Sequence, residues 1–109
     1  MPTLVTGATG FVGAHVARAL VERGDSVRAG YRNPKRLERL GDLDVEPVAG
    51  EILDLDAMRA AMRGCETVFH VAGFVGSQPV GKVWELNQRG PLVAVEAAAM
   101  EDVGRVVLT

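Results

Sequence analysis

The stretch Thr6-Gly7-Ala8-Thr9-Gly10-Phe11-Val12-Gly13 decides the fold of this chain. Its three glycines are spaced three residues apart, between a β-prone run at residues 3–6 and a helical pattern that places Val12, Val16 and Leu20 on one apolar face. Glycine permits a tight turn and a close backbone approach, and the free amides and positive dipole of a helix N-terminus attract a pyrophosphate. Because the glycines form the turn between a strand and a helix, they predict a dinucleotide-binding loop rather than a turn without a ligand.

Outward from this loop, β-prone segments alternate with helical segments along the whole chain. Asn33 and Asp54 stand where helix N-caps are expected, and Gly24 and Gly64 stand where helices end. Such alternation predicts an α/β fold, a Rossmann-type doubly wound parallel sheet with helices on both faces. The strands are expected at residues 3–6, 26–31, 45–48, 67–72 and 105–109.

Two prolines refine the predicted topology. Pro47 lies in the third strand and cannot donate to a sheet ladder, so this strand is expected at an edge, as in the order 3-2-1-4-5. Pro91 follows Gly90 inside the helical segment 80–100, where its missing amide predicts a kink. Residues 1–109 are expected to form one dinucleotide-binding Rossmann domain, the N-terminal half of a doubly wound sheet, truncated at the end of the fifth strand.

Composition narrows the class of partner. The 109 residues include 12 Lys and Arg against 14 Asp and Glu, a formal net charge of −2, which gives no field attracting nucleic acid or acidic lipid. No apolar run reaches the roughly 20 residues needed to cross a bilayer, and the first residues do not show the basic segment followed by an apolar one that a leader would have. The single cysteine, Cys65, can form no internal disulfide. We expect a cytoplasmic protein with a small-molecule substrate and with no nucleic-acid or membrane partner.

The end of the second predicted strand indicates which dinucleotide is bound. About 20 residues beyond a glycine loop, an acidic residue would hold the ribose 2′-hydroxyl of NAD. No acid lies there; Arg32 and Lys35 do, and a guanidinium matches a 2′-phosphate through paired charge-assisted hydrogen bonds. The segment predicts NADP(H) over NAD(H), with Arg32 as the main determinant, whereas Lys35 and Arg36 fit solvated charges at a helix start equally well.

Two reactive side chains are interpreted as structural. His70 lies within an apolar strand, although imidazole titrates near neutrality. Cys65 lies between Gly64 and Glu66, so neither adjacent residue is a cation that would activate its thiolate. We therefore predict no catalytic residue and no metal site in these 109 residues.

Four motifs in order resemble the extended short-chain dehydrogenase/reductase family of NAD(P)-dependent epimerases and dehydratases, especially its dihydroflavonol-reductase-like branch. They lie at residues 4–13, 50–54 and 64–73 and at Glu85-Leu86-Asn87 followed by Gly90. The first motif would line the pyrophosphate. Together with the analysis above, the resemblance implies cofactor contacts from Gly7, Thr9, Gly10, Phe11, Val12, Gly13, Arg32, Lys35, Glu51, Ile52, Ala72, Gly73 and Asn87.

The resemblance also implies roles for the later residues of that set. Glu51, in place of the family's more usual aspartate, would border the adenine ring together with Ile52. Ala72 and Gly73 would border the nicotinamide-side ribose. Asn87 would support the central strands and the cofactor pocket.

In this family, catalysis uses a Ser or Thr at the end of strand five and a Tyr-x-x-x-Lys pair on the next helix, which moves a proton as hydride passes to or from nicotinamide. Tyr31, the only tyrosine, precedes Lys35 by that spacing but belongs to the adenosine end. The 109 residues alone are therefore expected to be inactive. A full-length protein is expected to be an NADPH-dependent reductase of a small-molecule ketone or aldehyde, able to form a homodimer through helices beyond residue 109.

Two alternative functions remain open. A nucleotide-sugar epimerase or dehydratase shares this half of the fold but typically uses NAD. A non-catalytic NADP sensor or scaffold would also lack the Tyr-x-x-x-Lys pair. A Tyr-x-x-x-Lys pair in sequence downstream of residue 109 would favour the enzyme over the sensor.

Overall fold

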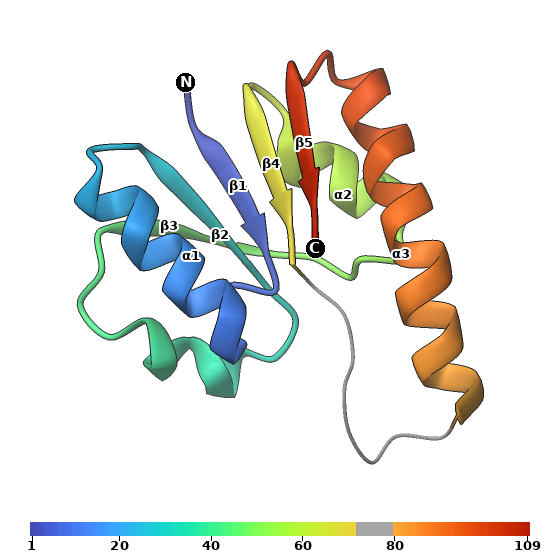
Figure 1. The fold of residues 1–109 in the computed structure, drawn as a ribbon, viewed down its shortest axis with the longest axis horizontal. Helices are drawn as coiled ribbons and strands as arrows, with labels where there is room; N and C mark the ends of the chain where they lie inside the picture. Colours follow the sequence, from blue (N-terminus) through green and yellow to red (C-terminus); the bar gives the residue numbers. More distant parts are fainter. Residues whose placement is uncertain (72–79) are drawn as a thin grey trace.

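The structure is a computed structural model that describes residues 1–71 and 80–109 (Figure 1). Its elements, in chain order, are β1 (Thr3–Thr6), α1 (Phe11–Glu22), β2 (Val27–Tyr31), the 3₁₀-helix η1 (Pro34–Leu40), β3 (Val45–Ala49), α2 (Leu55–Met62), β4 (Thr67–His70), α3 (Val80–Met100) and β5 (Arg105–Leu108). The strands form one parallel sheet in the order β3-β2-β1-β4-β5. The predicted α/β fold and strand order are confirmed.

Helices cover both faces of the sheet, as predicted. In Figure 1, α1 and η1 lie over one face, while α2 and α3 lie over the other. Two apolar clusters fill the layers between them and the sheet. The cluster under α2 and α3 includes Leu4, Met58, Met62, Val68 and Ala94, and the cluster under α1 and η1 includes Val5, Ala17, Leu20, Ala29 and Leu40.

The central strand is β1, and its four residues are all buried. It pairs with β2 on one side and with β4 on the other, so that Val5 lies between Ala29 and Phe69. β3 lies at one edge, with Pro47 opposite Ala29, which confirms the edge position predicted from the missing amide of that proline.

Local capping signals fix where the helices begin. The Asn33 side chain accepts a hydrogen bond from the Lys35 amide at 3.0 Å, and Asp54 Oδ1 accepts one from the Ala57 amide at 3.1 Å. Gly24 ends α1 with a φ of +95°, a conformation that favours glycine. Both predicted N-caps and the predicted helix end are confirmed.

The buried face of α1 differs from the predicted one. The sequence pattern placed Val12, Val16 and Leu20 on one face, but the fully buried residues are Gly13, Ala17 and Leu20, and Val12 is 54% exposed. The reason is that Gly13 must face the glycine turn, which rotates the first turn of the helix and brings Val12 outward. The prediction of an inward-facing Val12 was wrong.

Helix α3 continues through Pro91 as one element of 21 residues. Gly90 is buried, and a Cβ on it would lie 3.2 Å from Ile52 Cδ1 and 3.5 Å from His70 Nε2. This glycine therefore lets α3 approach the ends of β3 and β4. Within residues 1–71 and 80–109, α3 and the other helices are too short or too polar to cross a membrane.

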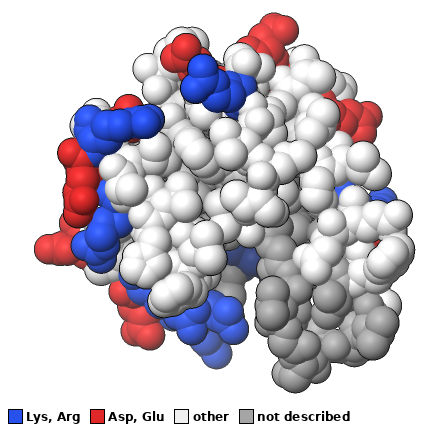
Figure 2. Space-filling view, viewed as in Figure 1, with Lys and Arg blue, Asp and Glu red and all other residues white. Residues whose placement is uncertain are grey.

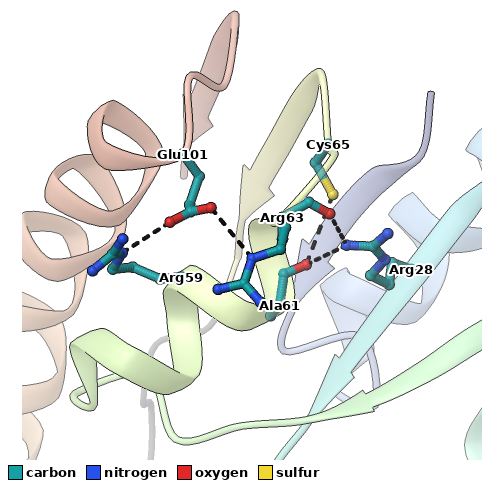
Figure 3. Close-up of polar contacts among 6 residues, drawn as sticks. All are labelled: Arg28, Arg59, Ala61, Arg63, Cys65 and Glu101. Atoms are coloured by element: carbon teal, nitrogen blue, oxygen red, sulfur yellow. Dashed lines mark hydrogen bonds and ion pairs between the residues drawn. The ribbon is translucent and has the colours of Figure 1, made fainter.

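Two groups of polar contacts hold α2 in place (Figure 3). From β2, Arg28 Nη1 donates to the carbonyl oxygens of Ala61 and Arg63, at 2.8 and 2.7 Å. After α3, Glu101 accepts from Arg59 Nε at 2.9 Å and pairs with Arg63 Nε at 3.6 Å. The C-terminal end of α2 is thus tied to the sheet on one side and to the end of α3 on the other.

Candidate functional site

The turn between β1 and α1 is closed by backbone hydrogen bonds. The Gly10 amide donates to the Gly7 carbonyl at 3.0 Å, and the Ala8 amide donates to the Gly30 carbonyl of β2 at 3.0 Å. Gly7 has a φ of +64°, in the left-handed region that residues with a Cβ rarely adopt. The turn is therefore compact and fixed to the carboxyl end of the central strands.

Gly13 lets α1 begin directly above this turn. A Cβ on Gly13 would lie 2.0 Å from the Gly7 oxygen and 2.7 Å from the Gly7 carbonyl carbon. The nearest neighbour of Gly13 is therefore the backbone of the turn, because α1 starts over the turn before it crosses the sheet.

The N-terminus of α1 presents unpaired amide donors. The N-cap residue, Gly10, has no side chain to accept a hydrogen bond from the first turn. Within the described part of the chain, no acceptor is bonded to the amides of Phe11, Val12 or Gly13. Phe11 is 80% exposed, so this end of the helix is open to solvent. Unpaired amides and the positive end of the helix dipole together form a cradle that suits a phosphate group.

Arg39 supports the loop from outside, a contact that the sequence analysis missed. Its Nη1 donates to the carbonyl of Thr9 at 3.2 Å, so η1 is fixed to the glycine turn. Thr9 itself is buried. No local signal could have found this pair, because the two residues lie 30 positions apart in the sequence.

An open hollow of about 490 Å³ lies beside the loop, between α1 and η1. It combines an aromatic side chain with cationic ones, and its lining consists of Gly10, Phe11, Ala14, His15, Arg18 and Arg39. In Figure 2, acidic and basic residues gather mainly along the left and upper rim of the molecule, whereas the centre of that view is largely uncharged.

Arg32 and Glu51 lie side by side at the carboxyl ends of β2 and β3. The two strands are in register, with Tyr31 opposite Ala49, so the residues that follow them lie close together. Arg32 Nη1 is 3.8 Å from Glu51 Oε2, and both side chains are about half exposed. The predicted phosphate-binding arginine therefore already has an acidic partner, which the sequence analysis did not foresee.

The other residues predicted to contact the cofactor do not gather around the glycine turn as Arg39 does. Lys35 and Asn87 are exposed, on η1 and α3 respectively. Ile52 packs against the apolar cluster under α2 and α3, so much of its side chain serves the core. Ala72 and Gly73 lie outside the described residues.

His70 and Cys65 are both buried, in agreement with the structural roles predicted for them. His70 Nδ1 lies 3.0 Å from Thr6 Oγ1, which also accepts from the Val71 amide at 3.1 Å. Burial lowers the pKa of His70 and, as the largest effect, raises the pKa of the Cys65 thiol. The imidazole is therefore neutral and the thiol protonated at neutral pH.

The buried His70 predicts a loss of stability in mild acid. The unfolded state takes up a proton near pH 6.5, whereas the folded state, with its lowered pKa, takes it up only at lower pH. The contribution of neutral His70 to the free energy of unfolding is therefore fully present above pH 6.5. As the pH falls below that value, the free energy of unfolding decreases by at most about 1.4 kcal/mol per pH unit.

A comparison of His70→Asn with His15→Asn by urea unfolding at pH 7.5 and pH 5.5 checks this expectation. The His70→Asn variant should lose less stability between the two pH values than the wild type. His15 is the other histidine of the chain and lies exposed on α1, so His15→Asn is the matched control for the substitution itself. An identical decrease in all three proteins would contradict the assignment.

Comparison with known proteins agrees with this geometry. A profile of a family described as NAD(P)H-binding matches residues 7–109, nearly the whole chain. The chain belongs to the NAD(P)H-binding family. The matched region begins at the first glycine of the turn and includes Arg32, Glu51 and α3.

Similar proteins of this NAD(P)H-binding group include reductases and epimerases. The chain is 38% identical over 111 residues to sterol demethylase protein B of Methylococcus capsulatus, covering 100% of this chain and 34% of that protein. It is 36% identical over 112 residues to cinnamoyl-CoA reductase 1 of Oryza sativa subsp. japonica, covering 96% and 32%. The crystal structure of UDP-glucose 4-epimerase with UDP-glucose, from Thermotoga maritima, matches with a TM-score of 0.81 and 25% identity, covering 99% of this chain and 37% of that one.

The chain spans about a third of the length of these NAD(P)H-binding relatives. It corresponds to the N-terminal part of larger Rossmann-fold dehydrogenases and epimerases, which confirms the predicted half of a doubly wound sheet. The resemblance to the short-chain dehydrogenase/reductase and epimerase/dehydratase group is likewise confirmed.

Proposed function

We propose that this chain binds NADP(H) and forms the cofactor-binding part of a reductase that acts on a ketone or aldehyde of a small molecule. The observation that carries the proposal is the open N-terminus of α1, where Gly10 provides no cap and Gly13 leaves room for the turn beneath it. Similarity to cinnamoyl-CoA reductase 1 supports the choice of a carbonyl reductase.

The residues of this chain would hold the cofactor and orient it. The amides of Phe11, Val12 and Gly13 are the donors available to the pyrophosphate. Arg32, at the end of β2, has the charge and the planar donors that suit a 2′-phosphate. When bound, the nicotinamide supplies the hydride; the site around α1 and β2 fixes the position of the adenosine end from which the nicotinamide extends.

An Arg32→Ala variant tests the preference for NADP(H). Charge-assisted hydrogen bonds contribute about 1.5–3 kcal/mol, so loss of Arg32 should weaken NADPH binding roughly 10- to 100-fold. NADH affinity should change little, because NADH has no 2′-phosphate. Kd values from fluorescence or calorimetric titration of both cofactors provide the measurement.

Arg105→Ala is a matched control for that titration. It removes the same charge from β5, at the far edge of the sheet from β3, and should leave both affinities unchanged. Equal wild-type affinities for NADPH and NADH, or an equal loss of both in Arg32→Ala, would count against the proposed preference.

A nucleotide-sugar epimerase or dehydratase is a second candidate. The likeness to UDP-glucose 4-epimerase favours it. Because such enzymes typically use NAD, a wild-type preference for NADH over NADPH in the same titration would support this candidate over the reductase.

A further inference from the structure

The Arg32–Glu51 ion pair lies where the two cofactors would differ. We propose that Glu51 sets the cofactor selectivity of this chain by competing with the 2′-phosphate of NADP(H) for Arg32. The inference rests on the proposed function, since it assumes that Arg32 meets the adenosine end of the cofactor.

The backbone holds the two side chains at a fixed spacing. Residues 31 and 49 are the last pair of the β2–β3 ladder, and the Gly50 amide donates to the Tyr31 carbonyl at 3.1 Å. Arg32 and Glu51 directly follow these bonded residues. Their proximity therefore comes from the strand ends and does not require two long flexible side chains to find each other.

The two carboxylate oxygens of Glu51 lie in different surroundings. Oε2 lies 3.8 Å from Arg32 Nη1, a distance typical of an ion pair and longer than a hydrogen bond. Oε1 is buried, and no donor among residues 1–71 and 80–109 is bonded to it. The carboxylate is thus turned partly into the protein, and its other oxygen faces Arg32, whose side chain is 56% exposed.

The consequence differs between the two cofactors. A 2′-phosphate would add a second anion beside the same guanidinium, so it must share Arg32 with Glu51 and is repelled by the carboxylate. The 2′-hydroxyl of NAD(H) is neutral and leaves the ion pair intact. Glu51 therefore selectively weakens NADP(H) binding, and the chain is less selective than Arg32 alone implies.

The family resemblance implies another role for Glu51, contact with the adenine ring, and this role leads to a different expectation. If the carboxylate mainly bound the adenine ring, its loss would weaken both cofactors equally, because adenine is common to both. Competition at Arg32 instead predicts a change in the ratio of the two affinities. The ratio therefore separates the two roles.

The test is a Glu51→Gln variant of the chain, titrated with NADPH and with NADH. Removing a partly exposed ion pair of this kind should tighten NADPH binding by about three- to fivefold and leave NADH within about twofold. The gain should shrink at high salt, because exposed charges are screened. Circular dichroism of each variant verifies that the protein is folded before its Kd is compared.

Two further variants make the result specific. Glu38→Gln removes one charge from η1, in the same crossover between β2 and β3, and should leave the ratio of affinities unchanged. In an Arg32→Ala background, Glu51→Gln should tighten NADPH less than in the wild type, since there is no guanidinium left to compete for and only the repulsion between carboxylate and phosphate is removed.

The inference is overturned if Glu51→Gln weakens both cofactors alike, leaves their ratio unchanged, or has the same effect without Arg32. Loss of NADPH preference in Arg32→Ala together with an unchanged ratio in Glu51→Gln would keep the proposed function and reject only the role of Glu51. An unchanged NADPH affinity in Arg32→Ala would instead reject the role of Arg32 in the proposed function.

Discussion

Replacement of Gly13 by alanine is expected to destabilise the fold by about 3 kcal/mol and to abolish dinucleotide binding. The added Cβ would lie 2.0 Å from the Gly7 oxygen, 2.7 Å from the Gly7 carbonyl carbon and 3.0 Å from Ala8 Cα. All three atoms belong to the backbone, so no flexible side chain can move aside. Either α1 must tilt or the turn must open, and both changes displace the amides that would hold the pyrophosphate.

Urea unfolding and cofactor titration of Gly13→Ala check this prediction. Gly81→Ala is the matched control, because a Cβ on Gly81 meets nothing within 4 Å. Gly81 lies in α3, where alanine is the better helix former, so this variant should keep or gain stability by up to about 1 kcal/mol. If Gly13→Ala unfolded at the wild-type urea concentration and still bound cofactor, the close approach would have no functional importance.

Replacement of Arg28 by alanine is expected to cost about 2–3 kcal/mol of stability. This arginine extends from β2 to the end of α2, where it donates to two carbonyl oxygens (Figure 3). It also lies 3.1 Å from Glu46 Oε1 of the neighbouring strand β3. Its side chain is only 17% exposed, so solvent screens these contacts little. Without it, the carbonyls of Ala61 and Arg63 lose a charged donor at the negative end of a helix dipole.

Thermal and urea unfolding of Arg28→Ala should be compared with Arg23→Ala. Arg23 pairs with Asp25, but its side chain is 69% exposed. An exposed pair contributes about 0–1 kcal/mol, so the control should change stability little although it removes the same charge. Equal losses in the two variants would mean that burial does not strengthen the contacts of Arg28.

The candidate site collects at one edge of the sheet. The glycine turn follows β1, Arg32 follows β2 and Glu51 comes shortly after β3. Because all five strands are parallel, segments that follow different strands meet at the same carboxyl edge. For this reason, the alternation of strands and helices in the sequence was enough to predict both the topology and the segments that form the site.

The sequence by itself determined the architecture and the position of the loop. Helix starts at Asn33 and Asp54, the edge position of Pro47 and the turn at Gly7 all follow from rules that act within a few residues. Such rules depend on backbone conformation and on amide donors, which a residue carries into any context. For this reason the strand order and the dinucleotide loop could be predicted without coordinates.

Only the tertiary structure decided which distant side chains meet. Arg39 contacts Thr9 across 30 positions, and Thr6 contacts His70 across 64. The pairing of Arg32 with Glu51 likewise depends on the register of β2 against β3, and the rotation of Val12 out of the core depends on the contact between Gly13 and the turn. Local propensity carries no information about strand register or helix rotation, because both are set by how whole elements pack against each other. The sequence therefore predicted a cofactor-binding arginine, and the packed fold supplied the acidic partner that we propose tunes it.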